Sequence, residues 1–467
     1  MSRIDQVSSP TTRFGALFCG ALVVLSALSG LVLTGRPEPR VAAQVQGNGI
    51  ALVGGALFDG TGSPPVRDSV ILIRGDRIER VGTVATLPVP AGYESISTEG
   101  LTVLPGLWDL HVHLIYSGHP NPGAWFRHDT EFQSVTIPAS ARQMLMAGVT
   151  SVRDLAAPAA AVLDVKRQVA EGRLPGPTIY AAGPALAKLA PNQTSITSQL
   201  QPVDGADDAR AKTRQLLDAG VDVVKVFFAE RMSPEERAAI VNEAHARGKK
   251  VAMHGQTDAE VRLGLQMGID DFQHIGIDSP EYAPDIMAAL RTRVTQGPPL
   301  YWTPTVGANG LLNAAYVGSK PEVIDDPENY LGLPAPLIAE VKAGWAAYQP
   351  RAPRADAETI VKRKVAQMRE AGVELVFGTD EGSAGQFARH STWMDADLWV
   401  RVLGFDPAWV LRRMTLDAAA MMAADRDYGS IVAGKYADVI AVGGDPLRHI
   451  DVLRAPALVI RHGRRFK

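Results

Sequence analysis

The sequence predicts an α/β fold, in which a (β/α)₈ TIM barrel over residues 105–425 is joined to a small β-sandwich built from both chain ends. Through the long middle of the chain, apolar strand-like segments alternate with helical segments, a pattern typical of a parallel sheet covered by helices. Residues 48–104 and 426–467 are β-rich, but neither piece has enough strands for a stable sheet of its own. We therefore expect the two end pieces to be halves of one sandwich, with the barrel inserted between them.

The composition excludes several classes of protein. Of the 467 residues, 46% are hydrophobic and 21% are charged, values that argue against a disordered chain, a coiled coil and a multi-span membrane protein. The formal net charge is −3, so no excess of basic residues favours a nucleic-acid partner. The single cysteine, Cys19, excludes an internal disulfide and a zinc site made of thiolates.

Residues 1–43 read as a targeting segment rather than as part of the fold. Residues 14–33 form an almost unbroken apolar run that follows Arg3 and Arg13, and residues 41–43 (Val-Ala-Ala) resemble a signal-peptidase site. We favour a cleaved secretory signal over the alternative, an uncleaved N-terminal membrane anchor, for which a run of about 20 residues is just long enough. Both alternatives predict an exported protein, periplasmic or secreted, and the second adds membrane attachment.

Eight segments of the middle read as strands, and typical helix signals lie between them. One helix is expected after Ser233, which forms a capping box with Glu236, and it stops at Gly248; a second runs from Thr257 to Gly268. Residues 307–371 are too many for a simple connection, so we expect helices there that cover the barrel mouth. The predicted strands are 102–114, 149–155, 178–184, 222–228, 250–255, 271–276, 301–306 and 373–380.

Six side chains at the predicted strand ends suggest a metal site. His111 and His113 are two residues apart, so both point to one face of the first strand, and two such imidazoles can share a cation. A lysine among Val and Phe residues is hard to explain structurally, because a buried, unpaired ammonium is very costly. Barrel enzymes keep their active sites at the C-terminal mouth, where all six would project. The other four members of the set are Lys225, His254, His274 and Asp380.

The segment Leu-Pro-Gly-Leu-Trp-Asp-Leu-His-Val-His-Leu resembles the first-strand signature of the amidohydrolase superfamily, Pro-Gly-x-x-Asp-x-His-x-His. The remaining ligand-type residues follow in the order of that family, and the resemblance extends from Ile50 to the chain end. Within the superfamily the set is most similar to the branch with imidazolonepropionase-like and Xaa-Pro dipeptidase (prolidase-like) members, which keep a lysine on the fourth strand.

The resemblance implies a binuclear centre and a hydrolytic reaction. A water between two divalent cations, with zinc as the default and manganese, cobalt or iron as alternatives, would attack an amide or peptide C–N bond. Asp380 would act as general base and then as general acid. The implied ligands are His111, His113 and Asp380 for the more buried cation, His254 and His274 for the second, and an N6-carboxylated Lys225 that bridges the two.

Several alternatives stay open at this point. The substrate class is a small molecule, with a dipeptide or an N-acyl amino acid as the first choices, and the same site suits an ester, a lactone or a phosphotriester. A mononuclear deaminase has no need of a bridging lysine, and the complete ligand set argues against an inactive barrel that only binds a ligand. Specificity would be set by loops 115–136 and 186–205 and by the segment after Val306. The sequence leaves a homo-oligomer open.

Weaker candidates surround this set. Asp109 is expected either to orient a ligand histidine without binding the metal itself or to serve as a capping or turn residue. Tyr116, Tyr180 and His390 are candidate substrate contacts, with Tyr180 alternatively filling the barrel. Arg389 is expected to be a solvated arginine, with a substrate carboxylate as the alternative partner.

Overall fold

The computed structural model describes residues 49–190, 197–308, 317–349 and 354–467. The apolar run 14–33 with Cys19 and the cleavage-like residues 41–43 lie outside the described residues. No helix among the described residues is long and apolar enough to cross a membrane.

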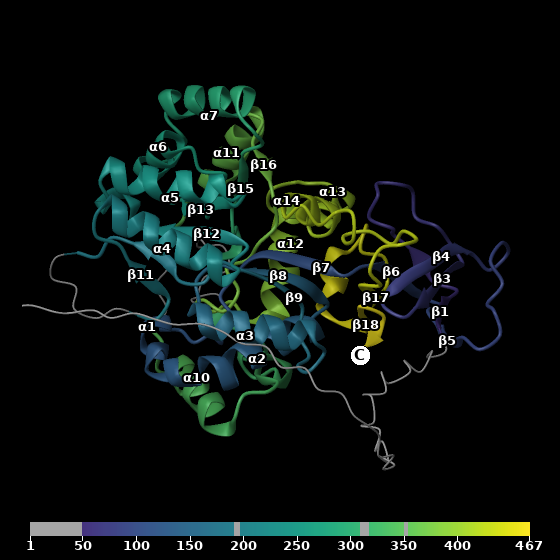
Figure 1. The fold of residues 1–467 in the computed structure, drawn as a ribbon. Helices are drawn as coiled ribbons and strands as arrows, with labels where there is room; N and C mark the ends of the chain where they lie inside the picture. The colour runs from purple at the N-terminus through teal and green to yellow at the C-terminus, as the bar shows by residue number, and fades with distance from the viewer. Residues whose placement is uncertain (1–48, 191–196, 309–316, 350–353) are drawn as a thin grey trace, which may run out of the picture. The chain divides into compact units, whose positions relative to one another are not determined.

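Eight parallel strands form the centre of the molecule (Figure 1). They lie in two hydrogen-bonded groups that also meet each other through the backbone. The Asp222 amide donates to the Ala181 carbonyl at 2.8 Å, and the Leu110 amide donates to the Phe377 carbonyl at 3.0 Å. The strands therefore close on themselves, which is consistent with a TIM barrel. They are β7 (Leu107–Val112), β8 (Val149–Asp154), β9 (Thr178–Ala181), β12 (Val223–Phe227), β13 (Lys250–His254), β14 (Asp271–Gln273), β15 (Tyr301–Thr303) and β16 (Glu374–Leu375), with β10 (Ala185–Ala187) and β11 (Leu200–Pro202) extending the sheet beside β12.

A long helix follows each barrel strand before the next one begins. The predicted capping box of Ser233 and Glu236 is confirmed, and the next helix begins at Thr257 with a second box, in which Glu260 is the reciprocal partner. Each box satisfies two backbone N–H groups that the first helical turn leaves free. The helices are α2 (Ile137–Met146), α3 (Ala159–Ala170), α4 (Ala206–Ala219), α5 (Pro234–Ala246), α6 (Asp258–Met267), α7 (Pro284–Gln296), α11 (Ala357–Glu370) and α12 (Ala388–Arg401).

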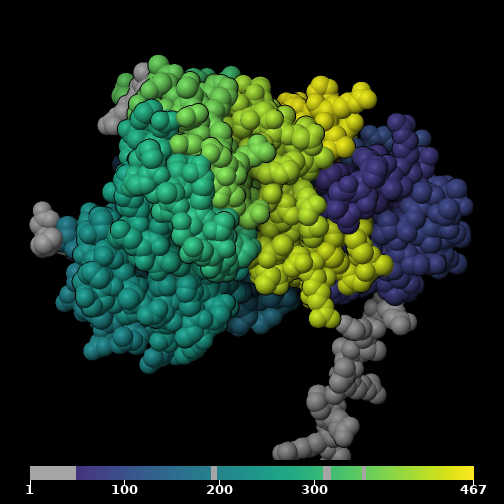
Figure 2. Space-filling model, turned by 90° about the horizontal axis from the view of Figure 1, so that it is seen from above, coloured from purple at the N-terminus to yellow at the C-terminus, as the bar shows by residue number. Residues whose placement is uncertain are grey.

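Strands from the two chain ends share one small domain. Strand β6 pairs antiparallel with β17, with Leu104 opposite Ile440, and Figure 2 shows the purple N-terminal and yellow C-terminal segments side by side. Leu52, Ile71 and Ile460 belong to its common apolar core. The two sheets are β4 (Arg77–Thr83), β3 (Ser69–Arg74), β1 (Ile50–Val53) and β5 (Glu94–Ser97), and β19 (Arg464–Arg465), β18 (Pro456–Arg461), β17 (Val439–Gly443), β6 (Leu101–Pro105) and β2 (Ala56–Leu57).

The single strand predicted for residues 102–114 is divided in two. Its first half is β6 of the small domain, and its second half is β7 of the barrel. The division falls at Gly106, where a side chain would collide with Thr150. The absence of a side chain lets the backbone pass tightly from one domain to the other at this point.

A helix from the segment after β15 covers the loop that follows β7, as the length of that segment predicts. The Trp345 indole N–H in α10 (Ala335–Ala347) donates to the Gly118 carbonyl at 3.1 Å, and His128 Nε2 lies 3.0 Å from Glu340. This end of the barrel is therefore enclosed by side chains far apart in the sequence. The shorter elements are α1 (Pro122–Trp125), η1 (Phe126–Glu131), η2 (Phe132–Thr136), η3 (Ala229–Arg231), α9 (Pro321–Ile324), η5 (Pro327–Tyr330), α13 (Pro407–Arg413), α14 (Leu416–Met421) and η6 (Ile450–Arg454).

Candidate metal centre

Three ligand-type side chains converge at the C-terminal end of β7. His111 Nε2 and His113 Nε2 lie 3.3 Å apart, and they are 3.3 and 3.2 Å from Asp380 Oδ1. The Asp380 amide donates to the His111 carbonyl at 2.8 Å, which joins the two chain segments directly. Two nitrogens and a carboxylate oxygen this close together form a candidate site for one divalent cation.

His254 and His274 extend this group across the mouth. The ring centroids of His111 and His274 are 4.6 Å apart, and those of His274 and His254 are 4.8 Å apart. Burial lowers the pKa of His274 to about 3 and holds the pKa values of His111 and His254 well below the usual value. The imidazoles are therefore neutral, which is the form that binds a metal. The Thr305 hydroxyl lies 2.8 Å from His274 Nδ1 and sets the orientation of that ring.

Lys225 lies in β12 within electrostatic reach of three of these imidazoles: His111, His254 and His274. Its side chain is 1% exposed, and its Nζ has no hydrogen-bond partner among the described residues. Burial lowers the pKa of Lys225 to about 7, against an opposing effect of the Asp271 carboxylate. The Lys225 ammonium therefore loses its proton more easily than that of an exposed lysine, and it does so beside the candidate ligands.

Asp109 acts on the backbone around the site rather than on an imidazole. Its fully buried carboxylate accepts the amide N–H groups of His111 and Thr379, both at 3.1 Å, and the Thr379 hydroxyl at 2.7 Å. Asp109 thus holds β7 against the residue that precedes Asp380. Asp109 therefore contacts His111 through the backbone amide and not through the ring, and Thr379 is a partner that the sequence did not suggest.

Buried carboxylates surround the candidate site. Asp109, Asp154 and Glu381 are at most 1% exposed, and none of them forms an ion pair within the part of the chain that the structure describes. Burial raises the pKa of Asp109 to about 7, that of Asp154 to about 6 and that of Glu381 well above its usual value. Bound cations would supply the positive charge that these groups lack.

Backbone strain concentrates at the same end of the barrel. His274, Thr305 and Asp380 follow strand ends and have positive φ angles of 69°, 41° and 64°, and Phe228 after β12 has 52°. Each such conformation costs about 1–3 kcal/mol in a residue other than glycine. Strain of this kind persists where the surrounding structure holds it, typically at functional sites.

A buried ion pair supports the barrel interior next to Lys225. Arg153 Nη2 lies 2.7 Å from Asp271 Oδ2, and both side chains are fully buried. The Arg153 Nε donates to the Leu110 carbonyl at 2.6 Å, immediately before His111. The pair therefore connects β7, β8 and β14, and it gives the Asp271 carboxylate a partner other than the Lys225 ammonium.

The candidate substrate contacts separate into two groups. Tyr116 lies at the site: its ring centroid is 5.7 Å from that of His113, and its hydroxyl donates to Gln199 Oε1 at 2.9 Å. Tyr180 instead packs in an apolar cluster, with its ring centroid 5.4 Å from that of Trp108. Tyr180 therefore fills the barrel interior, which was the alternative expectation for this residue, because Trp108 and the helix α14 cover it.

His390 and Arg389 are already engaged by acidic side chains of the described chain. His390 Nε2 lies 2.9 Å and Arg389 Nε 2.8 Å from Asp326 Oδ2, and Arg389 also pairs with Glu328. The Arg389 side chain is 19% exposed, so it is not the solvated arginine that the sequence suggested. These contacts tie α12 to η5 and leave neither residue directed at the histidine cluster.

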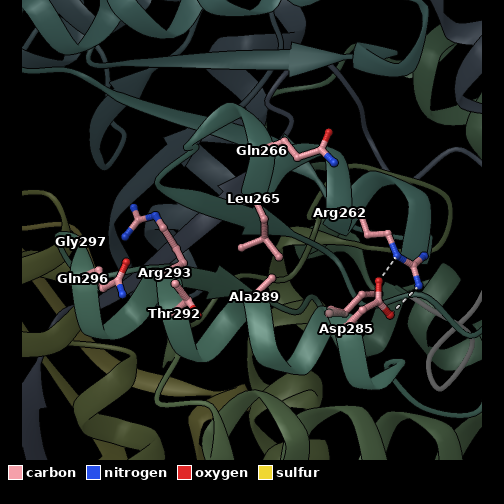
Figure 3. A pocket seen from close by; sticks show the side chains of 10 residues that line it. Arg262, Leu265, Gln266, Asp285, Ala289, Thr292, Arg293, Gln296 and Gly297 are labelled. Carbon is pink, nitrogen blue, oxygen red and sulfur yellow. Dashed lines mark hydrogen bonds and ion pairs between the residues drawn. The ribbon is translucent and has the colours of Figure 1, made fainter.

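A groove on the outer helical layer is separate from this centre (Figure 3). It lies between α6 and α7, has a volume of about 540 Å³ and includes Leu265 and Ala289 in its lining. Arg262 and Asp285 form an ion pair of 2.6 Å at one end. None of the candidate ligands lines it.

Comparison with known proteins places the chain in a family. The model of the amidohydrolase family matches residues 102–295 and 338–465. Ochratoxinase from Aspergillus niger is 25% identical over 516 aligned positions, which cover 100% of this chain and 95% of that protein. Imidazolonepropionase from Methylobacterium nodulans is 43% identical over 53 residues, or 11% of this chain and 13% of the relative.

Solved structures share the fold. A crystal structure of a protein described as a prolidase from Bifidobacterium longum has a TM-score of 0.67 at 24% identity and covers 90% of this chain and 95% of its own. An Xaa-Pro dipeptidase with bound methionine has a TM-score of 0.66 at 22% identity, with 90% and 100% covered. The chain belongs to the amidohydrolase family.

Proposed function

We propose that this protein uses two divalent cations to hydrolyse an amide or peptide bond in a small substrate, such as a dipeptide or an N-acyl amino acid. The observation that carries the proposal is the convergence at one barrel mouth of six potential ligands from five separate strands. His111, His113 and Asp380 would hold one cation, and His254 and His274 the other, with Lys225 between them. A zinc centre fits this histidine-rich set of nitrogen and oxygen donors.

The chemistry of Lys225 supports a bridging role. A neutral amine can attack CO₂ with its nitrogen lone pair, so that an N–C bond forms, one proton is released and a carbamate anion remains. The Nζ of Lys225 is buried, lacks a hydrogen-bond partner among the described residues and has a pKa lowered to about 7. A carboxylate at this position would give two cations a shared oxygen ligand, whereas an ammonium would repel them.

Asp380 is suited to transfer the proton. Divalent cations, when bound, would lower the pKa of a water at this site and polarise a substrate carbonyl. Burial acts to raise the pKa of Asp380, but contact with His113 and the nearby His274 outweigh it and hold that pKa below its usual value. The ionised carboxylate would accept a proton from the attacking water and deliver it to the leaving nitrogen as the C–N bond breaks.

An apolar wall beside the histidines suggests the kind of substrate. The ring centroid of Phe227 lies 4.3 Å from that of His254, and Leu200 and Ala187 pack in the same cluster, with Leu189 and Phe228 against it. An apolar side chain next to the scissile bond would fit such a wall. The similar structures include an Xaa-Pro dipeptidase and the relatives include ochratoxinase, which supports an amide substrate of small size.

A hydrolysis screen with metal-loaded protein tests the proposal. We expect turnover of dipeptides or N-acyl amino acids with apolar side chains and at least tenfold lower kcat/KM for charged ones, since an unpaired charge against an apolar wall costs more than about 1.4 kcal/mol. Lactones and phosphotriesters serve as the contrast. Turnover confined to those esters, or equal rates before and after removal of the metal by a chelator, would contradict the proposal.

The N-terminal run 14–33 leads us to propose further that the enzyme is exported, either with residues 1–43 removed or anchored through them.

A further inference from the structure

A second buried lysine lies outside the candidate metal centre. The Lys364 side chain in α11 is 1% exposed, and its Nζ donates to the Gly276 carbonyl at 2.9 Å. Asp278 Oδ1 lies 3.4 Å and Asp258 Oδ1 3.8 Å from the same Nζ, and the ring centroid of Tyr282 lies 4.8 Å from it. An ammonium taken fully out of water is retained where its charge and its donors are satisfied in this way.

The partners of Lys364 come from the two loops that follow His254 and His274. Asp258 begins α6, four residues after His254, and Gly276 is two residues after His274. The loops touch directly, since a methyl group on Gly276 would overlap the carbonyl oxygen of Gln256. The Ser279 hydroxyl donates to Asp258 Oδ1 at 2.8 Å and adds a further link between them.

Helix α11 is itself fixed against the second loop. Gln367, one turn after Lys364, accepts the Tyr282 amide at 2.8 Å through its side-chain oxygen and donates to the Tyr282 carbonyl at 3.0 Å. Ile360, Val361 and Met368 of the same helix are buried. Lys364 therefore brings a rigid element to the point where the two loops meet.

The contact between Lys364 and the second loop lies two residues after His274, a candidate ligand with a strained backbone. His274 has a φ of 69°, and a residue other than glycine stays in that conformation where its surroundings hold it. The Trp302 indole N–H donates to the His274 carbonyl, and Lys364 holds the carbonyl of Gly276 two residues later. The direction of the His274 ring thus depends on two fixed carbonyls on the same short segment.

We propose that Lys364 is a positioning residue for His254 and His274, and that its loss selectively weakens the second cation site. The inference rests on the proposed function. Side chains that bind a metal must be held to within about half an ångström. Among the described residues, the polar and ring contacts of Lys364 are with Gly276, Asp278, Asp258 and Tyr282, and not with β7 or the residues beside Asp380. The cation at His111, His113 and Asp380 is therefore expected to be independent of Lys364.

The test compares three single variants with the full-length wild-type chain. Lys364→Met keeps the length and volume of the side chain but removes the charge and the donors, and Lys364→Arg keeps a cation. Lys362→Met is the matched control, because Lys362 lies on the same helix with a side chain that is 47% exposed and paired with Glu358. Binding of Zn²⁺ by equilibrium dialysis gives the number of sites and the affinity of each.

We expect two cations for wild type and Lys362→Met, and one tight cation for Lys364→Met, with the second bound about 10–100-fold more weakly. Lys364→Arg is expected to recover part of the second affinity. An equal loss at both sites would indicate general destabilisation and overturn the inference, as would two unchanged sites in Lys364→Met. Wild-type protein that binds no cation would instead refute the proposed function.

A second variant keeps the inference testable if Lys364→Met does not fold, as judged by circular dichroism. Asp278 has a side chain that is 43% exposed, so Asp278→Asn is expected to fold. The substitution removes one of the two negative charges that face the Lys364 ammonium. The second cation should then bind more weakly, with the first unchanged. An unchanged second affinity in folded Asp278→Asn, together with an unfolded Lys364→Met, would assign Lys364 to stability alone and overturn the proposal.

Discussion

Lys225→Met is expected to lose bound metal and hydrolytic activity together. Methionine fills the volume of the lysine in the barrel, so the fold should survive, but it supplies no nitrogen that could take up CO₂. Loss of a partner that merely supports a metal ligand costs about 10–100-fold, and loss of a shared ligand should exceed this, so kcat/KM should fall by more than about 100-fold. Metal analysis of the dialysed protein and kinetics with the best substrate of the screen measure both effects.

Two controls separate the bridging role of Lys225 from a packing role. Lys250→Met removes a lysine at the opposite end of the neighbouring strand β13 and should leave metal content unchanged. In Lys225→Ala the vacated space should admit a short added carboxylate that partly restores activity. Near-native activity in Lys225→Met, or metal binding by wild-type apoprotein that is as tight in CO₂-free buffer as with bicarbonate, would remove the bridging role.

Asp380→Asn is expected to lower kcat by about 10²–10⁴-fold, the usual contribution of a general base. Asparagine tolerates the positive φ of 64° at this position, so the backbone should keep its course. The amide keeps an oxygen near His111 and His113 but cannot take a proton from water. Steady-state kinetics measure the loss of kcat, and the thermal unfolding midpoint of the same preparation shows whether the fold is kept.

Ser383→Ala is the matched control for Asp380. The Ser383 hydroxyl donates to the Asp380 carbonyl at 2.7 Å and lies 3.1 Å from its Oδ2, so its removal perturbs the surroundings of the carboxylate without removing it. We expect less than a tenfold change in kcat, equivalent to about one hydrogen bond. Asp380→Asn with kcat within tenfold of wild type would show that another group takes the proton.

The sequence identifies the metal-ligand candidates because their positions follow from strand periodicity. His111 and His113 lie on one face of a strand by alternation, and a lysine within an apolar strand signals a buried charge. The same argument applies to Arg153 and Asp271, which also interrupt predicted apolar strands and prove to be fully buried. Their partnership could not be read from the sequence, because it depends on which strands face each other across the barrel.

Contacts between residues far apart in the sequence are likewise not predicted by the sequence. Tyr180 of β9 packs inside the barrel. His390 and Arg389 both pair with Asp326, which lies in the segment after β15. Lys364 appears in the sequence as an ordinary helical lysine, and its burial follows from where α11 meets the loops after β13 and β14. The division of strand 102–114 at Gly106 also needs Thr150 to be in place.

The central claim, a pair of cations held by six side chains at the barrel mouth, is tested most directly by locating the metal. Protein grown in zinc-supplemented medium should contain close to two zinc ions per chain, and anomalous diffraction from its crystals should show one peak among His111, His113 and Asp380 and a second between His254 and His274. Extra density on Lys225 should join them. Protein without zinc, or peaks away from these residues, would contradict the account.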